Sequence, residues 1–394
     1  MTRIAFEMIG GPQWRGGYNY LLNLLAILAA YRPGAIEALL FVGSDNDPSE
    51  LAPFQDIPGV TIIVDPWFDA HRRSRRMLSA LFRDCDMGTA RRFMAKGADL
   101  VFTNARLLGG SFPIPILAWL PDFQHLQMPQ LFTRVAWWRR EFGYRRQIGE
   151  ASAVLLSSES ARQDAVAAYS ALHNVHVARF AVPAPRNVNA DADRAVVAEL
   201  GVSGRYFFLP NQFWPHKNHE CAIRAAALLS KAAPDAMIVT TGTVDARNPG
   251  RMAMLDAMIV ESGANMRLLG SQPYAKVGAL LRASKALVNP SRFEGWSTTV
   301  EEAKSAGKAM VLSNLLVHRE QAGDAAFYFD PDDPAALAEA LLQQLATPPP
   351  EAESEPVLQA AAALRIEAFA DAFLRAVAAA RGEPVALAGS GVAA

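Results

Sequence analysis

Short apolar runs alternate with longer amphipathic segments along the first half of the chain. The short runs lie at 3–9, 38–42, 60–64, 99–103, 115–119 and 153–156. Apolar residues with a helical period follow the first run at 18–30, and segments rich in Arg, Ala and Leu separate several of the others. Strands that alternate with helices predict a parallel sheet covered by helices on both faces.

A second series of the same kind begins after the Pro-containing stretch at 180–189. Its predicted strands lie at 206–209, 236–240, 266–269, 286–288 and 309–312, and its predicted helices at 219–231, 250–261, 275–283, 298–306 and 333–345. Two α/β series joined by a linker predict two Rossmann-like domains that face a cleft. The expected ranges are 1–185 and 186–355, a C-terminal helix at 356–381, and a small-residue tail at 382–394 that we expect to fray.

Composition narrows the class of protein. The 394 residues are 51% hydrophobic and 20% charged, which fits a well-packed globular chain of two domains. The formal net charge of −1 gives no support to nucleic-acid binding. Two cysteines, Cys85 and Cys221, argue against a disulfide scaffold and suit a reducing compartment. Because the sequence shows neither a signal-peptide pattern nor an apolar run of about 18 residues, we expect a cytoplasmic protein.

Basic residues gather in the first domain. Residues 1–185 hold 19 basic and 16 acidic residues, with arginine clusters at 72–76, 91–92 and 139–146. Trp137, Trp138, Phe142 and Tyr144 are interleaved with the last cluster. Two interpretations are open: peripheral contact with an anionic membrane, or arginines that are solvated or paired within the fold.

The chemistry-bearing pattern with the strongest context is 289–308, where a predicted strand, a loop and a helix follow one another. The loop carries Glu294, and Glu302 lies in the helix that follows, so both carboxylates can point at one ligand. Carboxylates accept hydrogen bonds from neighbouring hydroxyls, which a sugar or a ribose presents. Free backbone N–H groups at 295–299 suit an anion at a helix N-terminus. The alternative is that both glutamates are solvated surface charges.

Two further features are found at the start of this helix and in an earlier strand–loop–helix segment at 208–219. Thr298 and Glu301 have the spacing of a capping box, which would leave Glu302 for a ligand. Lys217, at the loop–helix junction of 208–219, is placed to meet a phosphate. The alternative for Lys217 is an exposed residue at a helix start. His216 and His219 form an H-x-x-H pair without a third ligand nearby, which is a weak metal signal.

These motifs together resemble the retaining glycosyltransferases of family four, also called glycosyl transferases group 1. The resemblance rests on NQFWPHKNH (211–219), EGWSTTVEE (294–302), AKSAGKAMVLSNLLVHREQ (303–321) and YFDPDDPAALAEAL (328–341) in the second half, and on Gly16-Gly17 and WLPDFQHLQMP (119–129) in the first. It implies the GT-B fold, with two Rossmann-like domains facing an interdomain cleft and a C-terminal helix that returns to the first domain.

The resemblance also implies donor-side roles. Lys217 would bind the donor diphosphate, Glu302 the nucleotide ribose and Glu294 the transferred sugar. The remaining donor-side positions would be the backbone of Gly295, Trp296 and Ser297, and the nucleobase frame from Gly270 to Tyr274. The family commonly has an arginine where this chain has Asn211, and Arg292 is a candidate for the compensating cation.

On the acceptor side, Gly16 and Gly17 are similar to the family's loop before the first helix. His125 is the candidate for polar catalysis at the acceptor, with Asp122 as a weaker companion. The alternative for His125 is a histidine hydrogen-bonded within its loop. Aspartate triplets at 45–47, 84–86, 191–193 and 330–332 are interpreted as turns and helix starts, so no catalytic metal and no cofactor are expected.

The resulting hypothesis is a metal-independent retaining hexosyltransferase. It would move a hexosyl unit from a nucleoside-diphosphate sugar, with GDP-mannose one candidate, to a saccharide or lipid-linked acceptor in cell-surface polysaccharide assembly. Two alternatives stay open: a GT-B-fold epimerase or phosphorylase, and a non-catalytic sugar-nucleotide-binding component of an assembly complex.

Overall fold

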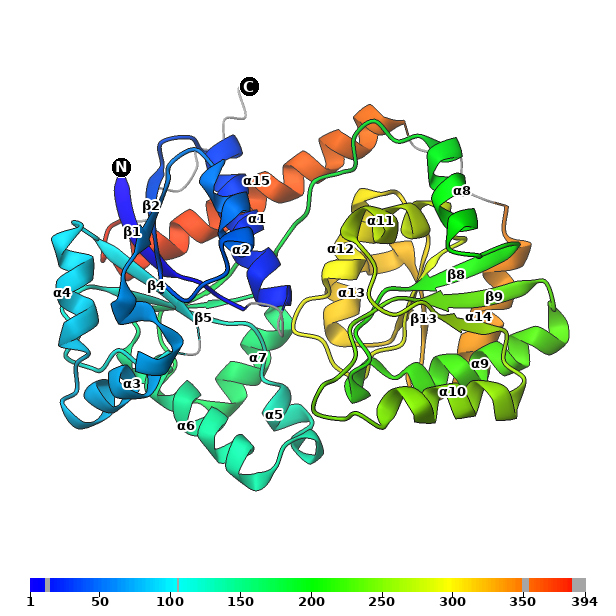
Figure 1. The fold of residues 1–394 in the computed structure, drawn as a ribbon, viewed down its shortest axis with the longest axis horizontal. Coiled ribbons are helices and arrows are strands. Elements are labelled where there is room, and N and C mark those ends of the chain that lie inside the picture. The colour runs from blue at the N-terminus through cyan, green and yellow to red at the C-terminus, as the bar shows by residue number, and fades with distance from the viewer. Residues whose placement is uncertain (11–14, 105, 349–353, 385–394) are drawn as a thin grey trace, which may run out of the picture. The chain divides into compact units, whose positions relative to one another are not determined.

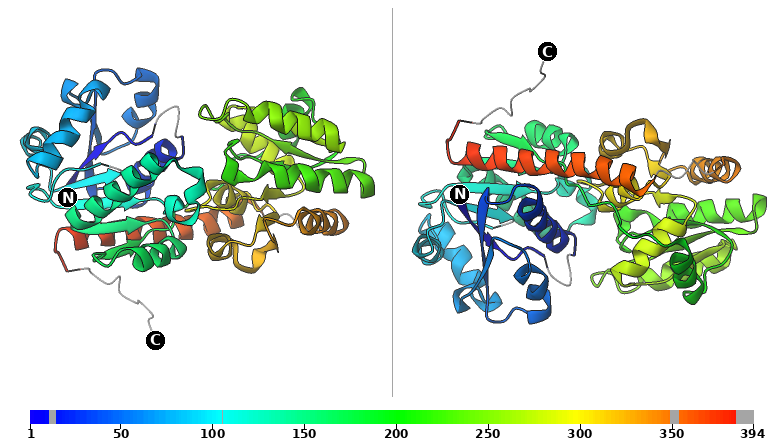
Figure 2. Two further views of the ribbon diagram at one scale, coloured as in Figure 1. Left: turned by 90° about the horizontal axis from the view of Figure 1, so that it is seen from below. Right: turned by 90° about the horizontal axis from the view of Figure 1, so that it is seen from above.

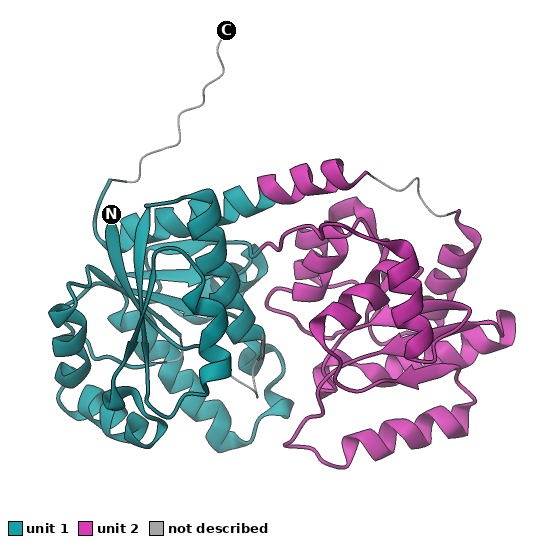
Figure 3. Ribbon diagram, turned by 45° about the horizontal axis from the view of Figure 1, so that its top comes forward, with its two compact units in different colours: residues 1–180, 365–394 teal, residues 181–364 magenta. Residues whose placement is uncertain are grey.

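The computed structural model describes residues 1–10, 15–104, 106–348 and 354–384. The chain divides into two compact units, shown in separate colours in Figure 3: unit 1 is Met1–Phe180 with Arg365–Ala394, and unit 2 is Ala181–Leu364. The part of the predicted tail beyond 384 lies outside the described residues.

Unit 1 is built on a seven-stranded parallel sheet with the order β3-β2-β1-β4-β5-β6-β7. Its strands are β1 (Thr2–Glu7), β2 (Ile36–Val42), β3 (Val60–Val64), β4 (Leu100–Asn104), β5 (Ile116–Leu120), β6 (Ala153–Leu156) and β7 (Val175–Val177). Its helices are α1 (Arg15–Tyr31), α2 (Pro48–Gln55), α3 (Arg73–Phe82), α4 (Met87–Ala95), α5 (Gln124–Gln127), α6 (Arg134–Glu150) and α7 (Glu159–Ala168). The central strands β5 and β6 are buried throughout, as expected for a sheet with helices on both faces (Figures 1 and 2).

Unit 2 holds a six-stranded parallel sheet with the order β10-β9-β8-β11-β12-β13. Its strands are β8 (Arg205–Leu209), β9 (Ala236–Thr240), β10 (Met266–Leu268), β11 (Leu287–Asn289), β12 (Met310–Ser313) and β13 (Ala326–Phe329). Its helices are α8 (Ala190–Glu199), α9 (His219–Ala232), α10 (Arg251–Ser262), α11 (Tyr274–Ala283), α12 (Thr298–Ser305), α13 (Leu316–Ala322) and α14 (Pro334–Ala346). One apolar cluster packs α9 and α14 against the sheet, and a second packs α11 and α12 against it.

The last helix, α15 (Glu355–Ala380), is shared between the units, because the division falls at Arg365 within it. Its later part completes the core of unit 1: Phe369 contacts Tyr20 at a ring-centroid distance of 6.1 Å, and Phe373 contacts Phe102 at 5.6 Å. An ion pair of 2.7 Å between Arg32 Nε and Asp371 Oδ1 fixes the same segment.

The structure confirms the fold class predicted from the sequence, namely two Rossmann-like α/β domains. The apolar runs do not predict the edge strands β7 and β13, because each is short and largely only partly buried. Across the described ranges, we find no helix with both the length and the apolar character needed to cross a bilayer.

Candidate active site

The order of the strands in unit 2 reverses direction between β8 and β11. From β8 the chain continues to β9 and β10 on one side, and from β11 it continues to β12 and β13 on the other. In open α/β sheets the crevice beyond the carboxyl ends of two such strands is the usual ligand site. Lys217 follows β8 and Glu294 follows β11, so the topology brings these two predicted residues to one place.

Lys217 and Glu294 form an ion pair there. The Lys217 Nζ atom donates to Glu294 Oε1 at 2.7 Å and to Oε2 at 2.8 Å, and the two side chains are 14% and 7% exposed. Burial alone would raise the pKa of Glu294, but the charge of Lys217 and its hydrogen bonds outweigh that effect and lower this pKa to about 2. Glu294 is therefore a carboxylate at neutral pH.

The loop that carries Lys217 is fixed by Asn218. Residues Pro215–Lys217 form one turn of 3-10 helix, and Asn218 then adopts a left-handed conformation with φ of 58°. Asparagine tolerates this region better than most residues. Its side-chain amide donates to the Pro290 carbonyl at 3.0 Å, which ties the loop after β8 to the loop after β11.

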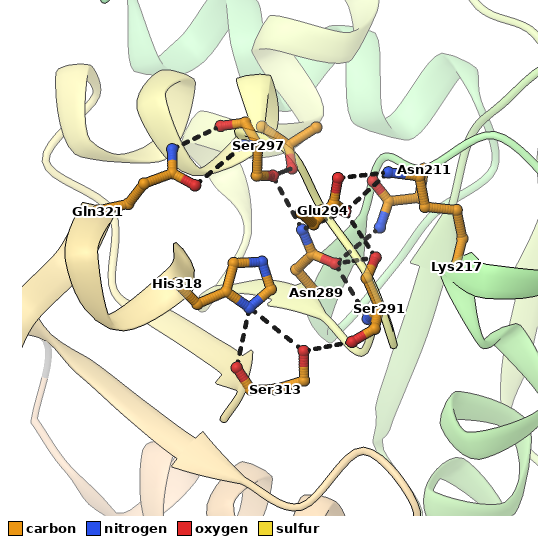
Figure 4. Close-up of polar contacts among 10 residues, drawn as sticks. Asn211, Lys217, Asn289, Ser291, Glu294, Ser297, Ser313, His318 and Gln321 are labelled. Atoms are coloured by element: carbon orange, nitrogen blue, oxygen red, sulfur yellow. Dashed lines mark hydrogen bonds and ion pairs between the residues drawn. The ribbon is translucent and has the colours of Figure 1, made fainter. Parts of the chain in front are cut away.

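Glu294 is hydrogen-bonded to a network of buried side chains (Figure 4). Asn289, the last residue of β11, donates from Nδ2 to Ser297 Oγ at 3.0 Å. The Ser291 hydroxyl lies 2.7 Å from Glu294 Oε1 and 2.7 Å from Asn289 Oδ1. Asn211 also donates to Asn289 Oδ1, at 3.0 Å. Asn211 is therefore buried in this network, and its amide is used to join β8 to β11.

The start of α12 differs from the prediction. Ser297 is the N-cap residue and its side chain makes no capping bond to the helix. The predicted capping box is wrong, because Glu301 is buried and accepts hydrogen bonds from Gln321 Nε2 at 3.1 Å and Lys304 Nζ at 3.0 Å. Gln321 also accepts from the Ser297 amide at 2.9 Å. The Ser297 amide, expected to face an anion, is thus occupied.

The neighbouring positions Gly295 and Trp296 lie in the loop between β11 and α12, and both residues are half-buried. They separate Glu294 from the N-cap residue Ser297, so the loop holds the carboxylate close to the first turn of α12. The structure therefore places the predicted loop of Glu294 next to the predicted start of the helix. Of the three backbone positions expected to contact the donor, Gly295, Trp296 and Ser297, the last is bound to Gln321.

Glu302 lies on the partly buried side of α12, one residue after Glu301. The Tyr274 hydroxyl, at the start of α11, donates to Glu302 Oε1 at 3.1 Å. Burial raises the pKa of Glu302 to about 7, although the bond from Tyr274 lowers it. Gly270 precedes this tyrosine in a left-handed conformation with φ of 66°, and its carbonyl accepts from the Gly242 amide at 2.9 Å. The predicted ribose and nucleobase positions are thus neighbours.

Arg292, the candidate for the compensating cation, forms an ion pair with Asp332. Its Nε and one terminal nitrogen lie 2.9 and 2.8 Å from Asp332 Oδ1. The guanidinium is therefore already neutralised by a carboxylate of the same unit. His216 and His219, the weak metal pair, contact different aromatic rings, those of Trp214 and Phe213 respectively.

In unit 1, His125 is fully buried. Its Nε2 atom lies 3.1 Å from Glu141 Oε2, and the Tyr169 hydroxyl donates to the same oxygen at 2.7 Å. Burial lowers the pKa of His125, although the hydrogen bond to Glu141 raises it. This placement favours the alternative of a hydrogen-bonded histidine, with the partner on α6 rather than in its own loop. Asp122 accepts from Arg140 at 2.6 Å and from the Gln124 amide at 2.9 Å.

The two glycines Gly16 and Gly17 lie within the first turn of α1, not ahead of it as predicted. The aspartate triplets serve local structure: Asp47 and Asp86 accept bonds from backbone amides as helix N-caps. Among the residues that the structure describes, no three His, Cys, Asp or Glu side chains are grouped closely enough to hold a metal ion.

Several site residues were not singled out from the sequence. Asn218, Asn289, Ser291 and Gln321 bind loop to loop, and His318 is fully buried with Nδ1 at 2.9 Å from the Ser313 carbonyl (Figure 4). Asn289 and Ser291 directly follow the predicted strand at 286–288, and Asn218, His318 and Gln321 lie within the motifs 211–219 and 303–321. These positions place the residues near the correct edge of the sheet but do not identify their partners.

Comparison with known proteins agrees with this geometry. The chain has the GT-B fold: it superimposes on Anabaena Alr3699/HepE, solved with UDP and glucose, with a TM-score of 0.66, 17% identity and coverage of 97% of this chain and 98% of that one. Sucrose-phosphate synthase of Thermosynechococcus elongatus gives a TM-score of 0.64 and 16% identity, with 96% of each chain covered. At these identities the likeness shows the fold.

The sequence of unit 2 matches a known family. Residues 198–360 match the family described as glycosyl transferases group 1, the family that the motifs of this unit resemble. O-antigen chain mannosyltransferase B of Escherichia coli is 36% identical over 90 residues, which is 22% of this chain. The aligned part spans 24%, about a quarter, of the length of that curated relative.

Proposed function

We propose that this protein is a retaining glycosyltransferase that transfers a hexosyl unit from a nucleoside-diphosphate sugar. The observation that carries the proposal is the pairing of Lys217 with Glu294 at the point where the strand order of unit 2 reverses. A cation for the diphosphate and a carboxylate for the sugar hydroxyls lie within one hydrogen bond of each other. Glu302 lies near Tyr274, ready to accept from a ribose.

The proposed mechanism follows from where charge develops. A departing nucleoside diphosphate gains negative charge while the anomeric carbon becomes electron-deficient. Lys217 would stabilise the leaving group, because a fixed cation in a water-poor site acts most strongly on the charge formed in the transition state. Glu294 would orient the sugar through its hydroxyls. We propose front-face attack with retention, in which the leaving phosphate accepts the proton of the acceptor hydroxyl.

The identity of the substrates is also a proposal. The name of the Escherichia coli relative supports a mannosyl donor, and GDP-mannose is our first candidate. The proposed acceptor is a saccharide or a lipid-linked saccharide in cell-surface polysaccharide assembly. We propose a cytoplasmic location, with which the two free buried thiols of Cys85 and Cys221 accord. We further propose that no metal is needed, so EDTA should leave the rate unchanged.

The first test is a thermal-shift measurement with GDP, UDP and dTDP and their sugars. A ligand at about 100 times its Kd stabilises the native state by about 2.7 kcal/mol, which raises the Tm measurably. The second test is incubation of the preferred donor with a panel of saccharide and lipid-linked acceptors. NMR of the product reports the anomeric configuration, and Lys217→Met and Glu294→Gln should each reduce transfer at least 100-fold.

The outcomes separate the alternatives. A new glycosidic bond with release of nucleoside diphosphate supports the proposal. Conversion of the donor sugar without transfer would show a GT-B-fold epimerase, and binding without turnover across the whole panel would show a non-catalytic component. Full transfer activity in both Lys217→Met and Glu294→Gln would reject the assigned site.

A further inference from the structure

Most of the clustered arginines of unit 1, together with Arg83 and Arg134 near the clusters, fall into two groups. The first group is ion-paired within the fold. Its pairs are Arg76 with Glu7, Arg92 with Asp65, Arg140 with Asp122, Arg145 with Glu141, and Arg146 with Asp84 and Glu150. For these arginines the interpretation of partners inside the protein is correct.

The second group is exposed and forms no ion pair within the described part of the chain. Its members are Arg73 and Arg75 on α3, Arg83 just after it, Arg91 on α4, and Arg134 and Arg139 on α6. Six guanidinium groups therefore reach solvent from three helices without an intramolecular carboxylate to neutralise them.

Large apolar side chains lie exposed among these arginines. On α3 and just beyond it, Phe82 is 83% exposed, and Met77, Leu78 and Met87 are each more than 40% exposed. Arg75, Leu78 and Phe82 are spaced at i, i+3 and i+7, which places them on one face of α3. Exposed apolar side chains that gather in one place among polar residues are typical of an interaction surface.

Helix α6 repeats the pattern. Val135, Trp138 and Phe142 have the same i, i+3, i+7 spacing and are 78%, 63% and 51% exposed. Figure 1 shows α3 and α6 on the same side of unit 1. The ion pair of 3.1 Å between Arg146 on α6 and Asp84, two residues beyond α3, joins them. We call the exposed residues of α3, α4 and α6 the basic–apolar face.

The basic–apolar face contains a hollow. Arg75, Arg83 and Arg91 converge on a surface pocket of about 510 Å³ that is also lined by Leu78, Phe82 and Met87. Three arginines at the rim suit a phosphate, and apolar side chains beside them suit the first carbons of a lipid. Trp67 forms another wall of the pocket.

We propose that the basic–apolar face binds the surface of an anionic phospholipid bilayer. Arginine-rich amphipathic helices with exposed Phe, Trp and Leu lie in the membrane interface, where the charges meet lipid phosphates and the apolar residues enter the acyl boundary. A nucleic acid would meet the arginines but would leave the apolar side chains in water. This inference rests on the surface of unit 1 and does not depend on the activity proposed for unit 2.

The test is co-sedimentation of the full-length protein with vesicles of 30% phosphatidylglycerol and 70% phosphatidylcholine, compared with phosphatidylcholine alone. We expect binding to the anionic vesicles that weakens as salt rises from 50 to 500 mM. The variant Arg75→Gln/Arg83→Gln/Arg91→Gln should bind on the order of 100-fold more weakly. Phe82→Ser/Trp138→Ser should bind at least tenfold more weakly, because the inserted area is lost.

Matched controls change residues of the same type in unit 2. Val260→Ser removes an apolar side chain that is 81% exposed, and Arg224→Gln removes an exposed arginine of α9 that forms no ion pair among the described residues. Both controls should bind as the wild type does. Because all substituted residues are exposed, circular dichroism should show that every variant is folded.

Three results would overturn the proposal. The first is absence of binding to anionic vesicles at low salt. The second is equal loss of binding in the controls. The third is unchanged binding in Phe82→Ser/Trp138→Ser together with equally tight binding to heparin or duplex DNA, which would show a general polyanion site. Free inorganic phosphate at 10 mM should not release the vesicle-bound protein if the bilayer is the ligand.

Discussion

The ammonium group of Lys217 lies 2.7 and 2.8 Å from the two carboxylate oxygens of Glu294, so in the ligand-free protein each group neutralises the other. The pair is mostly buried, and breaking it without a replacement partner is costly. A donor that offers a diphosphate to Lys217 and hydroxyls to Glu294 supplies both replacements together. A nucleoside diphosphate without a sugar supplies only one.

This asymmetry predicts that Glu294→Gln binds the nucleoside diphosphate more tightly than the wild type does. In the variant, Lys217 is no longer held by a carboxylate, and we expect Kd for the diphosphate to fall several-fold. Transfer should nevertheless fall at least 100-fold, because the sugar loses its orienting group. Isothermal titration calorimetry and a product-release assay measure the two effects separately.

The control for this prediction is Asp193→Asn, which also breaks a buried carboxylate–guanidinium pair in unit 2, that with Arg282. It should destabilise the protein and leave the Kd of the diphosphate unchanged. Weaker diphosphate binding in Glu294→Gln would contradict the idea that the ion pair competes with the ligand.

A second prediction concerns pH. Burial raises the pKa of Glu302 to about 7, so this side chain is mostly protonated at pH 6 and mostly ionised at pH 8. The ionised form accepts hydrogen bonds from ribose hydroxyls at both oxygens, whereas the protonated form is a weaker acceptor and uses one oxygen as a donor. We expect the affinity for a nucleoside-diphosphate sugar to rise about tenfold between pH 6 and pH 8.

The ligand for the pH experiment must be a nucleotide sugar, because its esterified phosphates do not titrate in this range, whereas a terminal phosphate does. Glu302→Gln should bind with nearly the same affinity at both values of pH. An equally steep pH dependence in Glu302→Gln would assign the titration to another group.

A third prediction concerns the hydrogen bonds between Gln321 and the backbone of Ser297 at the start of α12. Gln321 accepts from the Ser297 amide and donates to the Ser297 carbonyl at 3.0 Å. Gln321→Met keeps the side-chain length and removes both bonds, together with the bond to Glu301 Oε1. It leaves the buried Ser297 amide unpaired, whereas the Ser297 carbonyl still accepts from the Glu301 amide at 3.3 Å. We expect a loss of about 1–3 kcal/mol in the free energy of unfolding, measured by urea denaturation. Gln344→Met, at a similarly buried position on α14, serves as the control.

A fourth prediction separates the two interpretations of His125. A buried imidazole bonded to Glu141 supports the fold, so His125→Asn should lower stability by about 1–3 kcal/mol because it removes one hydrogen-bond partner of the buried Glu141 carboxylate. Per folded molecule, transfer should fall less than tenfold at 15 °C. A loss of 10²- to 10⁴-fold at that temperature, with the protein still folded, would instead assign His125 to general acid–base catalysis.

The elements of this fold are well predicted from the sequence because buried parallel strands are continuous apolar runs. The buried strands at 153–156 and 236–240 lie where the apolar runs place them. Site residues directly after strands could be found in the same way, since a strand end fixes the edge at which they lie. Lys217 and Glu294 could be found because each lies in the connection that follows a strand predicted from its apolar run.

The partners of those residues could not be predicted. Gln321 lies 24 residues after Ser297 and takes its amide, so a helix N-terminus that looked free in the sequence is bound. Glu301 has the spacing of a capping box but binds Gln321 and Lys304 instead. Local spacing gives the capping interaction only when no tertiary partner competes, and a single sequence does not reveal such competition.

Helix α15 has a consequence for synthesis on the ribosome. The aromatic side chains Phe369 and Phe373, which pack onto Tyr20 and Phe102, are translated after the whole of the second domain. Part of the apolar surface of the first domain therefore stays exposed until the whole of the second domain and then α15 have left the exit tunnel. We therefore expect the first domain to depend on chaperones during translation more than the second domain does, although the first domain is translated earlier.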